Sequence, residues 1–336
     1  MASNKYVSEL TFLEYLQEIH EKHPSLYELL DPERIEADVI EGYRKELNTL
    51  SWEFEDQGVG GRGLGWSQAQ NRSNSRRVGM MSLMELFRPA SREFSVSSLR
   101  VLDVLGGSGT IAQLATTLGN SAPTIFTADI SNLMISSCRA HGLPYIRQSA
   151  TRSLFRDNSL DGVLIGYGTQ LLSRNARRLS VLEAYRTLKP GSRLVLHAFE
   201  ADQRAARFFD DVVHPYSRTG HPHEHLTRAE IRGLFADAGF CDVRISDMHD
   251  PFILDGQTAG EARRNALMHL YTAYDLCHIV GSGQEIEAKL EALVEKTLGP
   301  ISVRREEGHY IAEVPRTALV AIGVKTPEHD PDGGGR

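Results

Sequence analysis

The fold is decided by the stretch Val101-Leu-Asp-Val-Leu-Gly-Gly-Ser-Gly-Thr110. An apolar run turns through glycines into a segment with helical spacing, which predicts a strand, a tight turn and a helix. Glycines let the backbone approach a ligand closely, and the amides at the start of a helix can hold an anionic group. Twenty residues after Gly109, Asp129 ends the next predicted strand, where a carboxylate can bind both hydroxyls of a ribose. These residues predict a nucleoside site at the edge of an α/β sheet.

The glycine turn alone leaves two classes of cofactor open. The segment Gly107-Ser-Gly109-Thr-Ile-Ala112 also fits the dinucleotide pattern G-x-G-x-x-G/A, with Asp129 at the expected distance. A dehydrogenase that binds a nicotinamide dinucleotide is therefore an alternative at this point.

From Leu99 onward, short apolar runs alternate with helical segments, which is the pattern of βαβ units around a parallel sheet. Seven strands are predicted, at 99–105, 124–128, 145–147, 162–165, 193–198, 243–246 and 318–324. Helices are predicted at 109–118, 132–140, 176–188 and 227–238. We therefore expect a seven-stranded, mostly parallel sheet with helices on both faces, as in Rossmann-like α/β folds.

The regions outside this alternating pattern are assigned as follows. Residues 1–90 are predicted to form a helical N-terminal cap or lid, and residues 91–325 the main domain. Within that domain a helical insert is expected over 252–300, with helical segments near 258–280 and 285–298. The Pro/Gly/Asp-rich tail, 326–336, is expected to be disordered.

Four further features favour one of the two cofactors, because they resemble the class I S-adenosylmethionine-dependent methyltransferases. Asp103 with the glycine turn resembles motif I of that family, and Asp129-Ile-Ser-Asn-Leu-Met resembles its ribose-binding motif. The turn Leu188-Lys-Pro-Gly before a strand is more typical of methyltransferases than of dehydrogenases. The segment Ile165-Gly-Tyr-Gly-Thr is similar to that of quinone-biosynthesis C-methyltransferases.

The resemblance covers about residues 99–246 and implies S-adenosylmethionine as the cofactor, with S-adenosylhomocysteine as the product. It implies that Asp103 helps to hold the methionine amino group, that Asp129 binds the ribose diol and that Ile130 lies against the adenine. Ser149 stands where many members carry an aspartate for the adenine amino group, and Tyr167 is alternatively a core aromatic. The full expected cofactor set is Asp103, Gly106, Gly107, Ser108, Gly109, Asp129, Ile130, Ser149, Ala150, Gly166 and Tyr167.

Methyl transfer often requires a base to remove a proton from the acceptor, and histidine titrates near neutral pH. Four candidates lie at or beyond the end of the fifth predicted strand, near the carboxyl edge where open α/β sheets bind ligands: His197, His214, His221 and His223. A divalent metal held by His221, His223, His225 and Glu224 is an alternative. No metal is included in the prediction, because alternating histidines in a proline-containing loop fix no coordination geometry.

The walls of the acceptor site are expected from segments that the family does not specify. Trp66 and Arg72 lie in the glycine- and arginine-rich stretch 58–77, which is alternatively a solvated surface loop. Tyr216 lies in the histidine-rich segment. Tyr271 belongs to a tyrosine stripe on a predicted helix, and that stripe is alternatively a core or dimer contact.

Composition narrows the classes of partner. The chain of 336 residues has a net charge of −7, which disfavours nucleic acid because phosphates require a basic face. The three cysteines are scattered, so neither a disulfide framework nor a zinc site is expected. No apolar stretch is long enough to span a membrane, and the N-terminus carries no signal pattern, so a cytoplasmic location is expected. A homodimer is left open.

The function predicted from these observations is methyl transfer to carbon or oxygen of a small-molecule acceptor in specialised metabolism. One alternative is an enzyme of this fold that binds the cofactor but catalyses a rearrangement or cyclisation. A second alternative is a non-enzymatic adaptor that retains the cofactor pocket. Acceptor identity depends on side chains in the least recognisable segments, so the fold does not define it.

Overall fold

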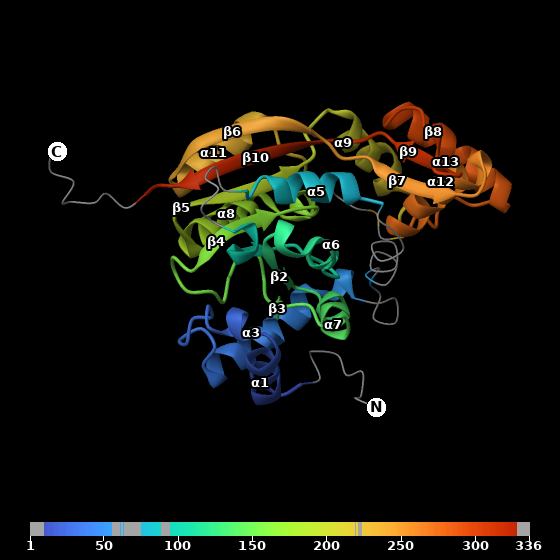
Figure 1. Cartoon of the computed structure of the whole chain (residues 1–336). Coiled ribbons are helices and arrows are strands. Elements are labelled where there is room, and N and C mark those ends of the chain that lie inside the picture. The colour runs from blue at the N-terminus through green and yellow to red at the C-terminus, as the bar shows by residue number, and fades with distance from the viewer. Residues whose placement is uncertain are drawn as a thin grey trace.

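The computed structural model describes residues 10–55, 61, 63, 75–88, 95–218, 220 and 224–327. A seven-stranded sheet forms its centre, in the order β3-β2-β1-β4-β5-β10-β6 (Figure 1). Only β10 runs antiparallel to its neighbours, so the predicted seven-stranded, mostly parallel sheet is confirmed. The strands are β1 (Arg100–Asp103), β2 (Thr124–Asp129), β3 (Tyr145–Arg147), β4 (Leu160–Ile165), β5 (Leu188–Ala198), β6 (Phe240–His249) and β10 (Thr317–Lys325).

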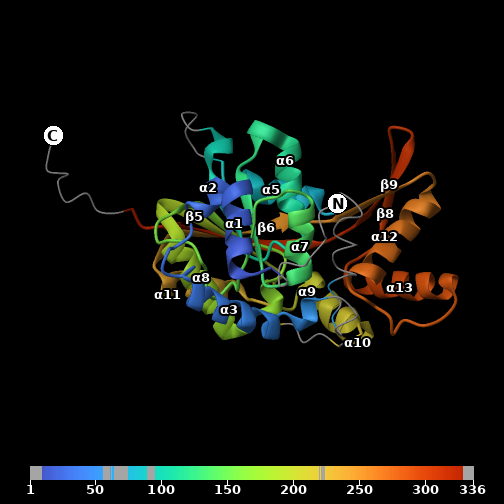
Figure 2. The same ribbon diagram turned by 90° about the horizontal axis from the view of Figure 1, so that it is seen from below.

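Helices cover both faces of this sheet, as Figure 2 shows. One layer contains α5 (Arg77–Glu85), α6 (Thr110–Leu118) and α7 (Asn132–Ala140), and the other contains α8 (Arg174–Thr187) and α11 (Arg228–Ala238). The predicted helices between the strands are confirmed to within a few residues at their ends. Helix α11 begins with the expected capping box, in which Thr227 and Glu230 satisfy free amides of the first turn.

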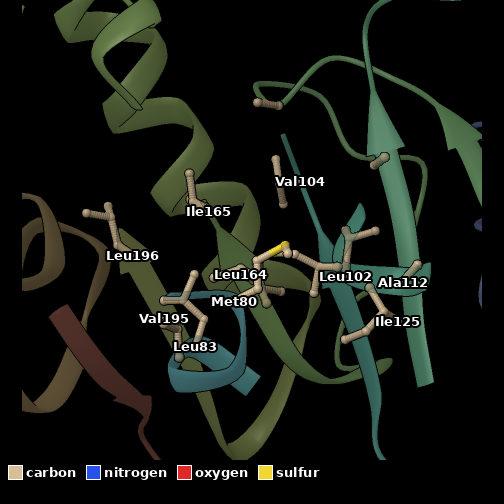
Figure 3. Packing of buried hydrophobic residues seen from close by; sticks show 14 of the residues in the cluster. Met80, Leu83, Leu102, Val104, Ala112, Ile125, Leu164, Ile165, Val195 and Leu196 are labelled. Carbon is tan, nitrogen blue, oxygen red and sulfur yellow. The ribbon is translucent and has the colours of Figure 1, made fainter. Parts of the chain in front are cut away.

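The core lies where α5 and α6 pack on the central strands. Figure 3 shows Met80 and Leu83 of α5 against Leu164 of β4 and Val195 of β5, and all four side chains are buried. Burial of each such side chain contributes about 1.5–3 kcal/mol. Helix α5 is therefore an integral part of the core, although the sequence placed it in the N-terminal cap.

The N-terminal helices α1 (Phe12–Lys22), α2 (Pro24–Tyr27) and α3 (Ala37–Leu50), with the short 3-10 turn η2 (Trp52–Phe54), lie beside β3 and α7. The amide of Arg147 in β3 donates to the Tyr15 hydroxyl at 2.8 Å, and Arg139 Nε of α7 donates to Glu18 at 2.7 Å. The described part of residues 1–90 is thus divided between the β3 edge and the core, and it does not form one separate cap.

The insert lies between β6 and β10 and contains strands as well as helices. Strands β7 (Phe252–Gly256), β8 (Ser302–Glu306) and β9 (His309–Val314) form an antiparallel sheet in the order β7-β9-β8, and α12 (Ala259–Ala273) packs on it. Helix α13 (Gly283–Thr297) packs on α9 (Arg204–Phe208). The predicted helices are present, but the prediction of a helical insert over 252–300 missed the three strands. In Figure 1 the insert lies far from α1 and α3, whereas the Ser75 carbonyl oxygen, just before α5, accepts the Ile253 amide of β7 at 2.8 Å.

The remaining short elements connect these layers. They are the 3-10 turns Val96–Ser98, Gly119–Ser121 and Thr169–Leu171, the π-helical turn η7 (Phe209–Val213) and α10 (His214–Tyr216). No helix among the described residues has the length and apolar character needed to cross a membrane.

Candidate cofactor and acceptor site

The glycine turn between β1 and α6 adopts a backbone that other residues rarely accept. Gly107 and Gly109 have φ angles of 55° and 78°, in the left-handed region. A Cβ on Gly106 would lie 2.7 Å from the Thr127 methyl group and 3.1 Å from an Asp103 carboxylate oxygen. Glycine is therefore required here by the backbone conformation and by close packing within the protein, and close approach of a ligand to this turn stays a prediction.

Asp129, the last residue of β2, ties this turn to the start of α7. One carboxylate oxygen accepts the Gly107 amide at 3.0 Å, and the other accepts the Ser131 amide at 2.8 Å. Burial raises the pKa of Asp129 to about 6, although these two hydrogen bonds oppose the shift. The carboxylate thus lies at the loop where a ribose diol would be bound.

Asp103, at the end of β1, is almost completely buried. Burial raises its pKa to about 7, the nearby charge of Asp129 raises it further, and Arg76 opposes both. A cationic ligand group would compensate for the cost of ionising this carboxyl. The donor set at the glycine turn therefore fits a nucleoside ligand that carries positive charge.

The other predicted cofactor residues lie near the same edge. Ser149 follows β3, and its hydroxyl bonds to the Thr151 hydroxyl at 2.9 Å while its amide donates to Tyr43 of α3. Ile130 is half-buried, and Ser108, Ala150 and Gly166 are buried. The Ser149 hydroxyl is thus engaged within its own loop, which leaves its role toward an adenine as a prediction.

Arg76, immediately before α5, joins the cofactor loop to the neighbouring part of the site. Its Nη2 donates to the Thr110 hydroxyl at 3.1 Å, and its guanidinium lies 4.5 Å from the centroid of the Tyr167 ring. In the sequence this arginine belongs to the stretch 58–77, which is predicted to be a wall of the acceptor site or a solvated surface loop. No local pattern distinguishes it from the other arginines of that stretch.

A second cluster lies beyond the carboxyl ends of β4, β5 and β6. The Tyr167 hydroxyl donates to Asp250 Oδ1 at 2.8 Å, and His197 Nε2 lies 3.3 Å from Asp250 Oδ2. The Tyr167 and His197 rings are 4.4 Å apart. Tyr167 has a φ of 49°, a left-handed conformation that is uncommon for a bulky residue and is often found at functional sites.

Asp250 is held at the centre of this cluster by Arg316. Arg316 Nη2 lies 2.6 Å from Asp250 Oδ2, and Arg316 Nε donates to the Asp250 carbonyl oxygen at 2.8 Å. Burial alone would raise the pKa of Asp250, but Arg316, His197 and Tyr167 outweigh it and hold the pKa below its usual value. Neither Asp250 nor Arg316 is among the residues predicted from the sequence. The rule that singled out His197 would have found Asp250, which follows the sixth strand at the same edge.

His197 is completely buried, and burial lowers its pKa although Asp250 partly opposes this shift. The ring is therefore neutral at neutral pH. Its Nδ1 is buried and has no hydrogen-bond partner among the described residues. A carboxylate can only accept hydrogen bonds, so the proton of the ring lies on Nε2 and the lone pair on Nδ1.

The structure separates the other predicted site residues from this cluster. His214 is exposed on α10, Tyr216 packs under Lys289 of α13, and Tyr271 packs on the hydrophobic core. Within the described residues, these two tyrosines make no hydrogen bond or ring contact with the cluster. The predicted residues Trp66, Arg72, His221 and His223 lie outside the described residues. In the described part of the chain, no three His, Cys, Asp or Glu side chains gather as metal ligands would.

Residues 102–196 match the family described as a methyltransferase domain. Among curated proteins, the chain is similar to a ubiquinone/menaquinone biosynthesis C-methyltransferase of Klebsiella pneumoniae, with 24% identity over 169 residues, which are 43% of this chain and 66% of that protein. The corresponding enzyme of Proteus mirabilis is 25% identical over 175 residues, 44% of this chain and 69% of its own. The chain thus spans about two thirds of the length of these relatives.

Solved structures with a similar fold include phosphoethanolamine N-methyltransferase 2 of Haemonchus contortus in complex with S-adenosyl-L-methionine. It has 14% sequence identity and a TM-score of 0.49, and the match covers 78% of this chain and 56% of that chain. A second is an S-adenosylmethionine-dependent methyltransferase of Archaeoglobus fulgidus, with 17% identity and a TM-score of 0.46, over 77% of this chain and 97% of that chain.

Proposed function

We propose that this chain, whose residues 102–196 match a methyltransferase domain, transfers a methyl group from S-adenosylmethionine to carbon or oxygen of a small-molecule acceptor. The observation that carries the proposal is the position of two sites side by side. The glycine turn with Asp103 and Asp129 lies next to the buried cluster of Tyr167, His197 and Asp250, and Arg76 contacts both.

The cofactor supplies an activated methyl group, and the chain supplies binding and orientation. Asp129 would bind the ribose diol, and Asp103 would face the amino group of the methionine moiety. The bare backbone of Gly106 and Gly107 would allow close approach of the cofactor. These roles follow the family resemblance, and the burial and charge of the two carboxyl groups support them.

On the acceptor side, His197 is the proton acceptor that the geometry favours. It is neutral and lies at the carboxyl edge of the sheet, and its Nδ1 is available among the described residues. His214 is exposed on α10 and is disfavoured, while His221 and His223 remain candidates from the sequence.

The acceptor class to test first is a phenol, quinol or enol. The similarity to ubiquinone/menaquinone biosynthesis C-methyltransferases supports this choice, and such acceptors become nucleophilic at carbon or oxygen when a base removes their proton. A small molecule is favoured over nucleic acid because the net charge of the chain is −7.

The test is incubation with methyl-labelled S-adenosylmethionine and a panel of phenols, quinols and enols. We expect one S-adenosylhomocysteine for each methylated product. A product formed without S-adenosylhomocysteine would favour the rearrangement or cyclisation alternative. Calorimetry that shows no binding of S-adenosylmethionine or S-adenosylhomocysteine up to millimolar concentration would contradict the proposal, because the chain would then not bind the cofactor.

A further inference from the structure

We propose that Asp250 and Arg316 form a positioning pair that fixes the tautomer of His197, so that Nδ1 is the atom that receives the acceptor's proton. We further infer that the insert between β6 and β10 holds Asp250 and Arg316 in contact with each other. The catalytic part of this inference rests on the proposed function. The tautomer and the role of the insert do not depend on it.

Both oxygens of the Asp250 carboxylate are engaged by neighbouring side chains. Oδ1 accepts the Tyr167 hydroxyl at 2.8 Å, and Oδ2 lies 3.3 Å from His197 Nε2 and 2.6 Å from Arg316 Nη2. Three groups from three separate segments thus hold one buried carboxylate in place. Because that carboxylate faces Nε2, the neutral imidazole carries its proton there, and Nδ1 keeps its lone pair.

Asp250 and Arg316 also occupy matching positions at the start and the end of the insert. Asp250 lies between β6 and β7, and Arg316 lies between β9 and β10, so the two residues mark the two ends of the insert. The Asp250 amide donates to the Arg316 carbonyl oxygen at 3.0 Å, and Arg316 Nε returns a hydrogen bond to the Asp250 carbonyl oxygen. The chain therefore leaves the central sheet and returns to it at a single place, where two hydrogen bonds join Asp250 and Arg316.

Residues of the insert also hold the Arg316 side chain. Its guanidinium lies 3.9 Å from the centroid of the Phe252 ring in β7, and Tyr274, just beyond α12, forms a side-chain hydrogen bond with it. Arg316 is consequently buried, with one face on an aromatic ring and its nitrogens on Asp250. Loss of the insert would remove both of these supports from the Arg316 side chain.

The proton step then balances as follows. A proton of the acceptor moves to His197 Nδ1, and the electron pair that is released forms the new bond to the methyl carbon. The carbon–sulfur bond of the cofactor breaks, and its electron pair stays on sulfur. The charged groups that face His197 are Asp250 after β6, Arg316 before β10 and Arg76 before α5, together with the neutral Tyr167 after β4. Asp250 is the one anion among them, so it stabilises the imidazolium that forms.

The first experiment needs no acceptor. In the wild-type chain labelled with ¹⁵N-histidine, long-range ¹H–¹⁵N NMR distinguishes a ring protonated at Nε2 from one protonated at Nδ1. The His197 signals are assigned by their loss in His197→Gln. We expect the Nε2–H tautomer at pH 7. An Nδ1–H tautomer would overturn the inference.

The second experiment compares Asp250→Asn with Asp247→Asn, the same change at an exposed carboxylate on β6. For Asp250→Asn we expect kcat to fall about 10²-fold, with KM and the affinity for S-adenosylmethionine within about twofold of wild type. Loss of the carboxylate disfavours the imidazolium, so the acid limb of the kcat profile should move to lower pH. The Asp247→Asn control should change neither kcat nor the pH of the acid limb.

An Asp250→Asn enzyme with the wild-type kcat and the wild-type acid limb would overturn the inference. A purely structural role would lower the amount of folded enzyme without moving the acid limb, and thermal unfolding curves report that amount. If the wild-type chain methylates no acceptor, the proposed function fails. The NMR result would still decide whether the pair fixes the tautomer.

Discussion

The carboxyl groups of Asp103, Asp129 and Asp250 lie at the edge of one sheet and differ in pKa because their neighbours differ. Asp103 and Asp129 have raised pKa values, since burial outweighs the hydrogen bonds and charges around them. Asp250 is buried as deeply, yet its pKa is lowered because Arg316 forms an ion pair with it. Ionised Asp103 would therefore be stabilised by an external cation, whereas Asp250 already has an internal one.

Replacement of Asp129 by alanine should weaken binding of S-adenosylmethionine by about 1.5–3 kcal/mol, because charge-assisted hydrogen bonds to the ribose are lost. The change also releases the amides of Gly107 and Ser131. Isothermal calorimetry measures the effect, with Asp237→Ala on the exposed face of α11 as the control. Wild-type affinity in Asp129→Ala would show that the diol is bound elsewhere.

The pKa of Asp103 makes stability depend on pH in the cofactor-free chain. The folded state holds the Asp103 proton up to about pH 7, whereas an unfolded aspartate loses it near pH 4. The stabilisation by this proton is therefore complete below about pH 4 and is lost as the pH rises toward 7. The free energy of unfolding of Asp103→Asn, minus that of wild type, should thus increase by about 1–3 kcal/mol between pH 5 and pH 7.

Urea unfolding at the two pH values measures this difference. The exposed Asp247→Asn variant provides the control and should show no such change. A difference between Asp103→Asn and wild type that is independent of pH would mean that Asp103 is ionised in the folded chain.

The sequence indicated the arrangement of residues around the glycine turn but not the cluster around Asp250 and Arg316, for a physical reason. Asp103, the glycines and Asp129 lie in one consecutive strand–turn–helix–strand unit, so their spacing along the chain is sufficient to bring them together. Asp250 and Arg316 form a unit only because β6 and β10 pair across an insert. No local pattern encodes that pairing.

At the level of elements, two helical glycines should respond in opposite ways to alanine. A Cβ on Gly79 of α5 would overlap Asp250 Oδ1 and lie 2.5 Å from the Tyr167 hydroxyl, whereas a Cβ on Gly42 of α3 would meet nothing within 4 Å. Gly79→Ala should therefore lower the free energy of unfolding by about 1–3 kcal/mol and reduce turnover. Gly42→Ala should raise it by about 0.5–1 kcal/mol.

Chemical denaturation and steady-state assays check this pair of variants. Both changes improve intrinsic helix propensity to the same degree. Opposite changes in the free energy of unfolding would therefore report the contact of residue 79 with the Tyr167–Asp250 cluster. Stabilisation by Gly79→Ala would mean that α5 does not pack closely on that cluster.

The elements that the sequence predicted well are those with continuous apolar runs, such as β4 and the middle of β5. Strand β8, with the sequence Ser-Val-Arg-Arg-Glu, was missed because four of its five residues are exposed and it lacks an apolar face. Its position is specified by pairing with β9 and not by its own pattern.

For the whole molecule, deletion of residues 258–298 should give an aggregating protein and not a soluble enzyme with altered selectivity. The deleted segment contains Leu267, Leu270, Leu276, Ile279, Leu290 and Val294, all buried. Its removal would uncover the sheet of β7, β9 and β8 and one side of α9. Soluble yield and dye binding to apolar surface measure the outcome. Val280→Ser, at a residue that is 74% exposed, is the control and should remain soluble. A soluble, monomeric deletion variant would contradict this account of the insert.

The strand order also has a consequence for how the chain is made. Strand β10 is the last strand in chain order that the structure describes, yet it lies between β5 and β6. During synthesis β5 and β6 are complete while the strand that joins them is still inside the ribosome. The open edge of β5 is then a site for wrong pairing with other chains. We expect the central sheet to close only after residues 317–325 have left the ribosome.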